Sequence, residues 1–302
     1  MSVLRETVAT LFRYSGLPSL IRALLVRDRA TIIFYHDPQP EVVERHLQYL
    51  AKHYRFETLD RVVDAIRRKD WTGIRRHSLV VTIDDGHRGN ARLGELFARY
   101  GVRPTIYLCS QIVGTERQFW FRLPGVRAGE SKPLPNAKRL AELKRRFDWD
   151  PLTVNAGQRH ALSLDELKQL QPHVDFGSHT RFHPILTTCS DAESREEIAL
   201  SKQEIEAMLG SECRHFSYPN GDYTVREANF AREAGYVSAR TVDLGWNGPD
   251  TDPYRLKMTG VSDDASVSVL ACQVVGFPTY FGRLMKGCVR GGHPVTRPIA
   301  TP

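Results

Sequence analysis

Short runs of β-branched and aromatic residues alternate along this chain with segments that have the spacing of amphipathic helices. The runs at residues 31–35, 79–83 and 104–109 have the length and composition of buried strands. Between them, residues 41–53 and about 90–100 have the periodicity of helices. Strands that alternate with helices form βαβ units, whose strands pair in parallel. The sequence therefore predicts an α/β fold, and its length suits a (β/α) barrel.

The alternation continues in the second half of the chain. We expect strands near residues 174–176, 214–218 and 237–241, and helices near residues 191–209 and 224–234.

Three segments depart from the barrel pattern. Residues 114–161 hold an aromatic cluster and a turn-rich stretch, and we interpret them as an insertion in a βα loop. Residues 1–29 carry five arginines among spaced apolar residues, which predicts an amphipathic helical segment. Residues 276–302 contain no acidic residue and form a basic C-terminal tail. The main domain is then expected at residues 30–275.

Two polar motifs follow predicted strands, where a parallel barrel gathers its catalytic groups. Asp84 and Asp85 end the run at 79–83 and are followed by Gly86, which allows the chain to leave extended geometry so that both carboxylates face one site. His179 and His183 lie four residues apart. One carboxylate and two imidazoles suit a divalent metal with open positions, and a second carboxylate can act as a base. The motifs together predict a metal-dependent hydrolase.

Each motif also has a structural interpretation. Asp-Asp-Gly is common in turns and helix caps, and eleven histidines in 302 residues produce some pairs at this spacing by chance. Pro184 disfavours helical geometry at His183, so we expect a turn there.

Three segments in register resemble the signature motifs of the polysaccharide deacetylases, the NodB-homology or carbohydrate esterase family 4 enzymes. Residues 82–86 read T-I-D-D-G against T-F-D-D-G, and residues 179–186 read H-T-R-F-H-P-I-L against H-[ST]-x-x-H followed by proline. Residues 216–221, F-S-Y-P-N-G, resemble the F-A-Y-P-x-G element of one branch of the family. The resemblance extends from about residue 30 to residue 261.

The resemblance implies a distorted, seven-stranded (β/α) barrel and a role for each matched residue. Asp85, His179 and His183 match the metal ligands, and Asp84 matches the base that deprotonates the attacking water. A backbone N–H near Tyr218 matches a donor to the oxyanion. The metal expected is zinc, with Co²⁺, Ni²⁺ and Mn²⁺ as alternatives.

Two positions depart from the family pattern. Ser217 stands where the third motif often has an arginine that braces the base, and residues 256–258 lack the histidine of the fifth motif. The F-A-Y-P branch shares both departures and carries a Y-H-[DER] element, which Tyr35-His36-Asp37 matches. We therefore predict His36 as the catalytic acid or orienting group, against the alternative of a structural histidine at a strand end.

Residues near the motifs are candidates for substrate binding. Tyr218, Pro219 and Asn220 lie in the third motif, where a simple turn is the alternative. Trp120, with Phe119 and Tyr107, could form an aromatic wall for a sugar ring, although core packing is the usual place for such residues.

Charge and cysteine content restrict the partners and the compartment. The net charge is +7, but basic and acidic residues are interspersed and no basic block is interleaved with aromatics, so we expect no nucleic-acid partner. The basic ends could contact an anionic membrane surface, against the alternative of an amphipathic helix packed on the barrel and a frayed tail. Five scattered cysteines and no secretory signal predict a cytoplasmic protein, peripheral to the inner face of the membrane.

The predicted function is removal of N-acetyl groups, or O-acetyl groups, from a glycan in surface polysaccharide or lipid-linked glycan biosynthesis. The alternatives are a peptidoglycan or chitooligosaccharide deacetylase, or a non-catalytic glycan-binding protein on the same scaffold. A zinc metalloprotease is disfavoured because the chain has no H-E-x-x-H motif.

Overall fold

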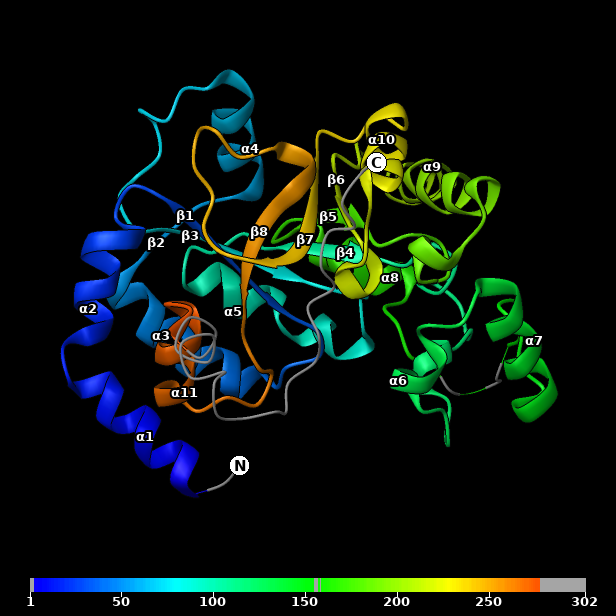
Figure 1. The fold of residues 1–302 in the computed structure, drawn as a ribbon, viewed down its shortest axis with the longest axis horizontal. Coiled ribbons are helices and arrows are strands. Elements are labelled where there is room, and N and C mark those ends of the chain that lie inside the picture. Colours follow the sequence, from blue (N-terminus) through cyan, green and yellow to red (C-terminus); the bar gives the residue numbers. More distant parts are fainter. Residues whose placement is uncertain (1–2, 155–156, 158, 278–302) are drawn as a thin grey trace, which may run out of the picture.

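A closed barrel of parallel strands forms the centre of the computed structural model, which describes residues 3–154, 157 and 159–277 (Figure 1). Seven strands follow one another around it in the order β1, β3, β4, β5, β6, β7, β8, and β8 pairs again with β1. The short strand β2 pairs with β3 outside this ring. The strands are β1 (Ala30–Tyr35), β2 (Arg55–Phe56), β3 (Ser78–Ile83), β4 (Thr105–Leu108), β5 (Asp175–Ser178), β6 (His215–Ser217), β7 (Ser238–Leu244) and β8 (Leu256–Gly260).

The ring is distorted, as the resemblance implied. A single residue pair, Ser178 with Phe216, joins β5 to β6. The register between β7 and β8 shifts between Arg240 and Leu244. The predicted α/β barrel is therefore confirmed in its distorted seven-stranded form.

Helices pack around the barrel, and those predicted at residues 41–53, 191–209 and 224–234 are present as α3, α9 and α10. The helices are α3 (Pro40–His53), α4 (Leu59–Arg68), α5 (Gly94–Arg99), α8 (Leu164–Leu170), α9 (Asp191–Leu209), α10 (Val225–Glu233) and α11 (Val267–Val274). Capping boxes begin α8 at Ser163, α9 at Ser190 and α10 at Thr224, which satisfies N–H groups that would otherwise lack partners.

The helix expected at about 90–100 is divided into two pieces. A 3₁₀ turn, η2 (Arg88–Arg92), comes first, and α5 follows. Gly89 and Gly94 lie in this segment, and glycine has the lowest helix propensity after proline. A continuous helix is therefore disfavoured.

The segment 114–161 projects from one side of the barrel (Figure 1). It contains the 3₁₀ turn η3 (Trp120–Arg122) and the helices α6 (Ala128–Ser131) and α7 (Asn136–Phe147). Its apolar side chains form a separate small core that also includes Ile185, two residues after the second motif histidine. The segment is thus packed against the loop that carries the predicted metal ligands.

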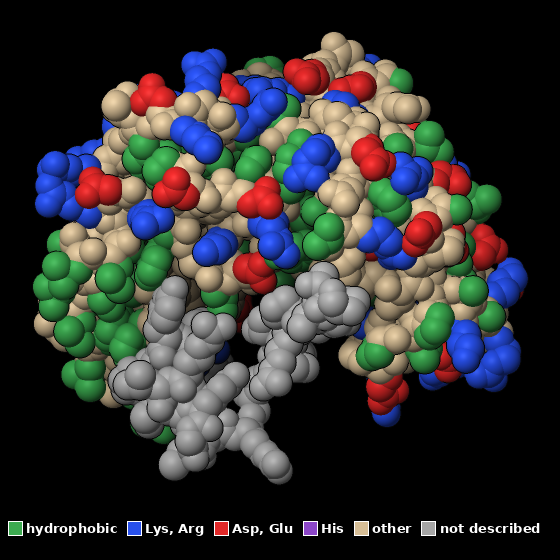
Figure 2. Space-filling model, turned by 45° about the horizontal axis from the view of Figure 1, so that its top comes forward, with side chains coloured by type: hydrophobic (Ala, Val, Ile, Leu, Met, Phe, Trp, Pro, Cys, Tyr) green, Lys and Arg blue, Asp and Glu red, His purple; other side chains and the backbone are tan. Residues whose placement is uncertain are grey.

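The N-terminal helices lie along the outside of the barrel. α1 (Val3–Tyr14) packs on α11 through the buried residues Ala9 and Phe12, and α2 (Leu17–Ile21) and the π-helical turn η1 (Arg22–Val26) follow. Many apolar side chains of this segment are exposed: Val3, Leu4, Val8, Leu11, Leu17, Leu20, Leu24 and Leu25. In Figure 2, hydrophobic side chains gather at the lower left, where α1 and α2 lie.

No helix in the described part of the chain has the length and apolar character needed to cross a membrane. The described cysteines are unpaired and buried. Most of the predicted basic tail, and Cys288 within it, lies outside the described residues.

Candidate metal and catalytic site

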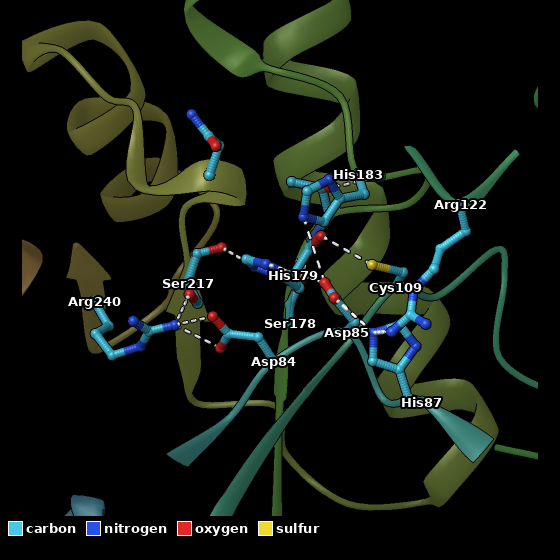
Figure 3. Close-up of polar contacts among 12 residues, drawn as sticks. Asp84, Asp85, His87, Cys109, Arg122, Ser178, His179, His183, Ser217 and Arg240 are labelled. Atoms are coloured by element: carbon cyan, nitrogen blue, oxygen red, sulfur yellow. Dashed lines mark hydrogen bonds and ion pairs between the residues drawn. The ribbon is translucent and has the colours of Figure 1, made fainter. Parts of the chain in front are cut away.

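Two adjacent carboxylates follow β3 and lie beside the motif histidines (Figure 3). The backbone leaves the extended conformation at Asp85, whose φ is 72°, and Gly86 follows with a φ of 68°. The sequence predicts this departure at Gly86, but it begins one residue earlier. A side chain at Gly86 would meet Leu108 Cδ2 at 2.7 Å, so glycine is required there for space as well as for conformation.

Asp85, His179 and His183 bring their ligand atoms within 4.8 Å of one another. Asp85 Oδ1 lies 3.6 Å from His179 Nε2 and 3.4 Å from His183 Nε2. All three side chains are buried, and Asp85 Oδ1 has no hydrogen-bond partner among the described residues. A buried oxygen without a partner is unfavourable, and a cation held between it and the two nitrogens would satisfy it. The donor set therefore fits a divalent metal ion.

Both imidazoles can offer the lone pair of a neutral ring nitrogen to a metal ion. His179 Nδ1 lies 2.7 Å from the carbonyl oxygen of Ser217 and must donate to it, which leaves Nε2 with a free lone pair. Burial lowers the pKa of His183 to about 3, so this ring stays neutral. His183 has a φ of 58° and Thr180 a φ of 69°, which confirms the turn that Pro184 predicted.

His87 holds the second oxygen of Asp85. Its Nε2 lies 3.0 Å from Asp85 Oδ2, and Arg122 Nη2 lies 3.1 Å from the same nitrogen. Burial raises the pKa of Asp85, but the His87 hydrogen bond and the neighbouring His183 bring it well below its ordinary value. Sequence reasoning missed His87, although a histidine directly behind Asp-Asp-Gly was a visible signal.

Asp84 is braced by an arginine from another strand. Arg240 Nη2, from β7, contacts both oxygens of Asp84 and lies 2.7 Å from Ser217 Oγ (Figure 3). Arg240 is 1% exposed and lies over the rings of Phe34 and Tyr107. Burial raises the pKa of Asp84, but Arg240, His179 and His36 lower it further, so the carboxylate is ionised.

The arginine that is missing at Ser217 is therefore supplied by the neighbouring strand. Ser217 pairs with Arg240 in the sheet, which places the guanidinium above the serine hydroxyl. Sequence reasoning missed Arg240, yet an arginine within the predicted buried strand at 237–241 was the signal for it.

The model of the polysaccharide deacetylase family matches residues 74–239, more than half of the chain. The chain belongs to this family. A comparison with curated protein sequences gave no significant match.

Solved structures with the same fold include IcaB from Ammonifex degensii, at 17% identity and a TM-score of 0.61, covering 83% of this chain and 99% of that one. The Streptococcus pyogenes deacetylase PplD in complex with acetate has 16% identity and a TM-score of 0.60, covering 82% of this chain and 98% of that one. The BpsB deacetylase domain from Bordetella bronchiseptica has 14% identity and a TM-score of 0.55, covering 77% and 95%.

In this polysaccharide deacetylase, His36 lies at the exposed end of β1. Its backbone N–H donates to Asp263 Oδ1 at 3.0 Å, and its ring packs against the edge of Phe34. Its charge is among those that act on Asp84. The structure thus brings His36 to the same end of the barrel as the base, and its catalytic role stays a prediction.

The third motif forms a 3₁₀ turn, η5 (Pro219–Gly221), in which Asn220 has a φ of 58°. Tyr218 is buried, and its hydroxyl donates to the carbonyl of Tyr254. Its N–H donates to the carbonyl of Arg240 at 3.2 Å, so it is engaged within the sheet. Pro219 is buried, whereas Asn220 is partly exposed and accepts a hydrogen bond from Lys132 of the insertion.

Trp120 supports the metal-ligand loop. Its indole Nε1 donates to the carbonyl oxygen of His183 at 2.9 Å, and Arg139 lies over its ring. Trp120 also lines a pocket of about 210 Å³ on the side of the loop that faces the insertion. Phe119 and Tyr107 are fully buried. The expectation that these two rings contact a sugar is therefore wrong, because they belong to the core.

Proposed function

We propose that this chain is a metal-dependent hydrolase that removes N-acetyl groups, with O-acetyl groups as the lesser alternative, from a glycan. The proposal rests on one observation: an ionised carboxylate lies beside a set of metal-ligand atoms, one of which has no hydrogen-bond partner among the described residues. Asp84 is fixed by Arg240, and Asp85 Oδ1 faces two imidazoles without a hydrogen-bond partner among the described residues. Family membership supports deacetylation as the reaction.

The metal would be held by Asp85, His179 and His183, and two imidazoles with one carboxylate favour zinc over harder ions. When bound, the metal supplies Lewis acidity to the acetyl carbonyl and lowers the pKa of water. Asp84 accepts the proton of the attacking water, and Arg240 keeps this carboxylate ionised and oriented. The leaving amine needs a proton, which we assign to His36.

The third motif also offers a candidate backbone donor for the oxyanion. The Tyr218 N–H is used within the sheet. The Asn220 N–H makes none of the hydrogen bonds found in the described part of the chain, and it follows Pro219, which has no N–H. We therefore assign the oxyanion donor to Asn220, two residues beyond the tyrosine that the sequence indicated.

Acetate release tests the proposal directly. Metal-loaded protein is incubated with N-acetylglucosamine oligomers and with cell-derived glycan lipids, and released acetate is quantified. Asp84→Asn and a chelator should each abolish release, whereas Asp28→Asn, at an exposed aspartate away from the site, should retain it. If metal binds but acetate is never released, the glycan-binding alternative replaces the proposal.

We also propose that the chain acts at the inner face of a membrane, on a lipid-linked or surface glycan. The exposed apolar side chains of α1 and α2 support this placement, because a soluble protein rarely exposes so many together. Arg5 and Arg13 lie on the same helix, and arginines beside an apolar face favour anionic lipid surfaces.

A further inference from the structure

A wide groove opens beside the metal site, and the catalytic groups described above leave it unused. Its volume is about 700 Å³, within the range of small-molecule sites. His87 lines the groove and also contacts Asp85 Oδ2 at 3.0 Å. The groove therefore begins one side chain away from the metal ligands.

Arginines dominate the charged lining of this groove. The charged residues that line it are Arg88, Arg92, Arg122, Arg159, Asp37 and Glu166. Both acids already face an arginine of the groove: Glu166 binds Arg159 through two contacts of 2.5 and 3.1 Å, and Asp37 Oδ2 lies 4.0 Å from Arg122 Nη2. Two arginines therefore remain without an acidic partner in the groove.

Neither of those two arginines binds an acid in the described part of the chain, so both can bind an anionic ligand. The Arg88 guanidinium forms no hydrogen bond or ion pair with any residue that the structure describes, and Arg92 donates to the neutral side-chain oxygen of Gln39 at 3.1 Å. Both are exposed and lie four residues apart on η2. Burial, and after it the nearby charge of Arg122, lowers the pKa of His160 in the same groove.

We propose that this groove binds a phosphate or diphosphate group of the acetylated glycan substrate. Guanidinium groups match phosphate oxygens with two parallel N–H donors, and charge-assisted hydrogen bonds of this kind are the strong ones. A neutral glycan would offer Arg88 and Arg92 no charge to neutralise. The inference rests on the proposed function, and it narrows the substrate to a sugar with an anionic group close to its acetamide.

A chain of contacts links the groove to the exposed apolar helix. Asp263 accepts from the backbone N–H of Asp37, which lines the groove, at 2.8 Å. Three residues later, Ser266 donates to Glu6 in the first turn of α1. The groove and the start of α1 are thus connected through one short loop. This connection would suit a phosphate that belongs to a lipid carrier. A soluble sugar phosphate offers the same chemistry.

Binding is measured on metal-free protein, because a bound metal ion would itself bind phosphate and obscure the contribution of the groove. Inorganic pyrophosphate is titrated into chelator-treated protein by calorimetry, at low and at physiological salt. Arg88→Gln and Arg92→Gln should each weaken binding about tenfold, and Arg88→Lys should recover part of the loss. Arg68→Gln, at an exposed arginine on α4, is the matched control. Equal affinity in all variants, or no binding by the unaltered protein, overturns the inference.

Turnover then separates this inference from the proposed function. Metal-loaded protein is given a neutral N-acetylglucosamine oligomer, N-acetylglucosamine 1-phosphate, and a polyprenyl diphosphate-linked N-acetylglucosamine in vesicles. A preference for a phosphorylated substrate that falls about tenfold in Arg88→Gln supports phosphate binding in the groove. Which of the two phosphorylated substrates is preferred identifies the source of the phosphate. Equal turnover of neutral and phosphorylated sugars by every variant overturns the inference but keeps the deacetylase. Pyrophosphate binding lost in Arg88→Gln, without acetate from any sugar, keeps the groove and overturns the deacetylase. A uronate-containing glycan is tested as a fourth substrate, and a preference for it would show that the groove binds a carboxylate, which overturns the phosphate assignment.

Discussion

Arg240 Nη2 lies 2.5 Å from Asp84 Oδ1 and also contacts Oδ2, so that one guanidinium holds both oxygens of the base. The two residues are 156 positions apart in the sequence, on β7 and at the end of β3. Because both are buried, the charge of each stabilises the other where solvent cannot. A residue outside the signature motifs therefore helps to keep the proposed base ionised.

Replacing Arg240 should shift the acidic limb of the activity profile to higher pH. Arg240 lowers the pKa of Asp84 against the effect of burial, so Arg240→Gln should raise that pKa. Asp84 must be ionised to accept a proton. As the pH falls, the variant should therefore lose activity at a higher pH than the unaltered protein. The measurement is kcat/KM from pH 4 to 9, with thermal unfolding to confirm folding. Arg240→Lys should shift the limb less, and an unmoved limb in Arg240→Gln contradicts the assignment.

Replacing His36 should slow turnover without unfolding the protein. The side chain is exposed at the end of β1, so His36→Ala removes little packing. Loss of a general acid costs roughly 10²-fold or more in rate. Near-normal turnover of His36→Ala would show that another group protonates the leaving amine.

The barrel and the candidate metal site could be predicted from the sequence because both rest on local signals. Strand composition, helix periodicity and the motifs around Asp84 and His179 are each read within a few residues. Arg240 and His87 were missed because their roles depend on which strands are neighbours and where a turn points a side chain. The expectation that Phe119 contacts a sugar was wrong for the same reason. The sequence does not show whether an aromatic residue near a site faces a sugar or the core, where Phe119 lies.

Removing the His87 brace should weaken metal binding. His87 donates to Asp85 Oδ2 at 3.0 Å while the other oxygen faces the metal ligands. Partners of this kind typically contribute 10- to 100-fold to metal affinity, so we expect a loss of about that size in His87→Ala. Competition with a chromophoric chelator measures the affinity, and His173→Ala, outside the site, is the control. A zinc affinity equal in both variants would show that His87 does not support Asp85.

Glu197 should make the protein less stable as the pH rises. This carboxylate accepts from the backbone N–H groups of Arg181 and Phe182, beside the ligand His183, and its burial raises its pKa to about 7. In the unfolded chain glutamate has a pKa of about 4.3. Between these two values the folded state holds the proton and the unfolded state does not, so stability falls as pH increases through this range and levels off above about 7.

Glu197→Gln tests this dependence because glutamine keeps an acceptor oxygen but does not ionise. The unaltered protein should lose on the order of 2–3 kcal/mol relative to the variant between pH 4.5 and pH 8. Urea unfolding of the metal-free proteins at several pH values measures the difference. Parallel stability curves for the two proteins would mean that Glu197 keeps an ordinary pKa.

Vesicle binding should depend on the apolar face of the N-terminal helices. Leu4 is 73% exposed and Leu24 is 71% exposed, and inserting such side chains into a membrane interface is favourable by roughly 1.5–3 kcal/mol each when burial is complete. The double variant Leu4→Gln/Leu24→Gln should therefore reduce co-sedimentation with anionic vesicles at least tenfold. Val225→Gln, at an apolar residue that is 60% exposed on α10, is the matched control. In the proposed placement, arginines of the same helices would meet anionic lipid, so binding should also weaken with salt and with neutral vesicles. Equal binding by the double variant and the control would place this apolar face against something other than a membrane.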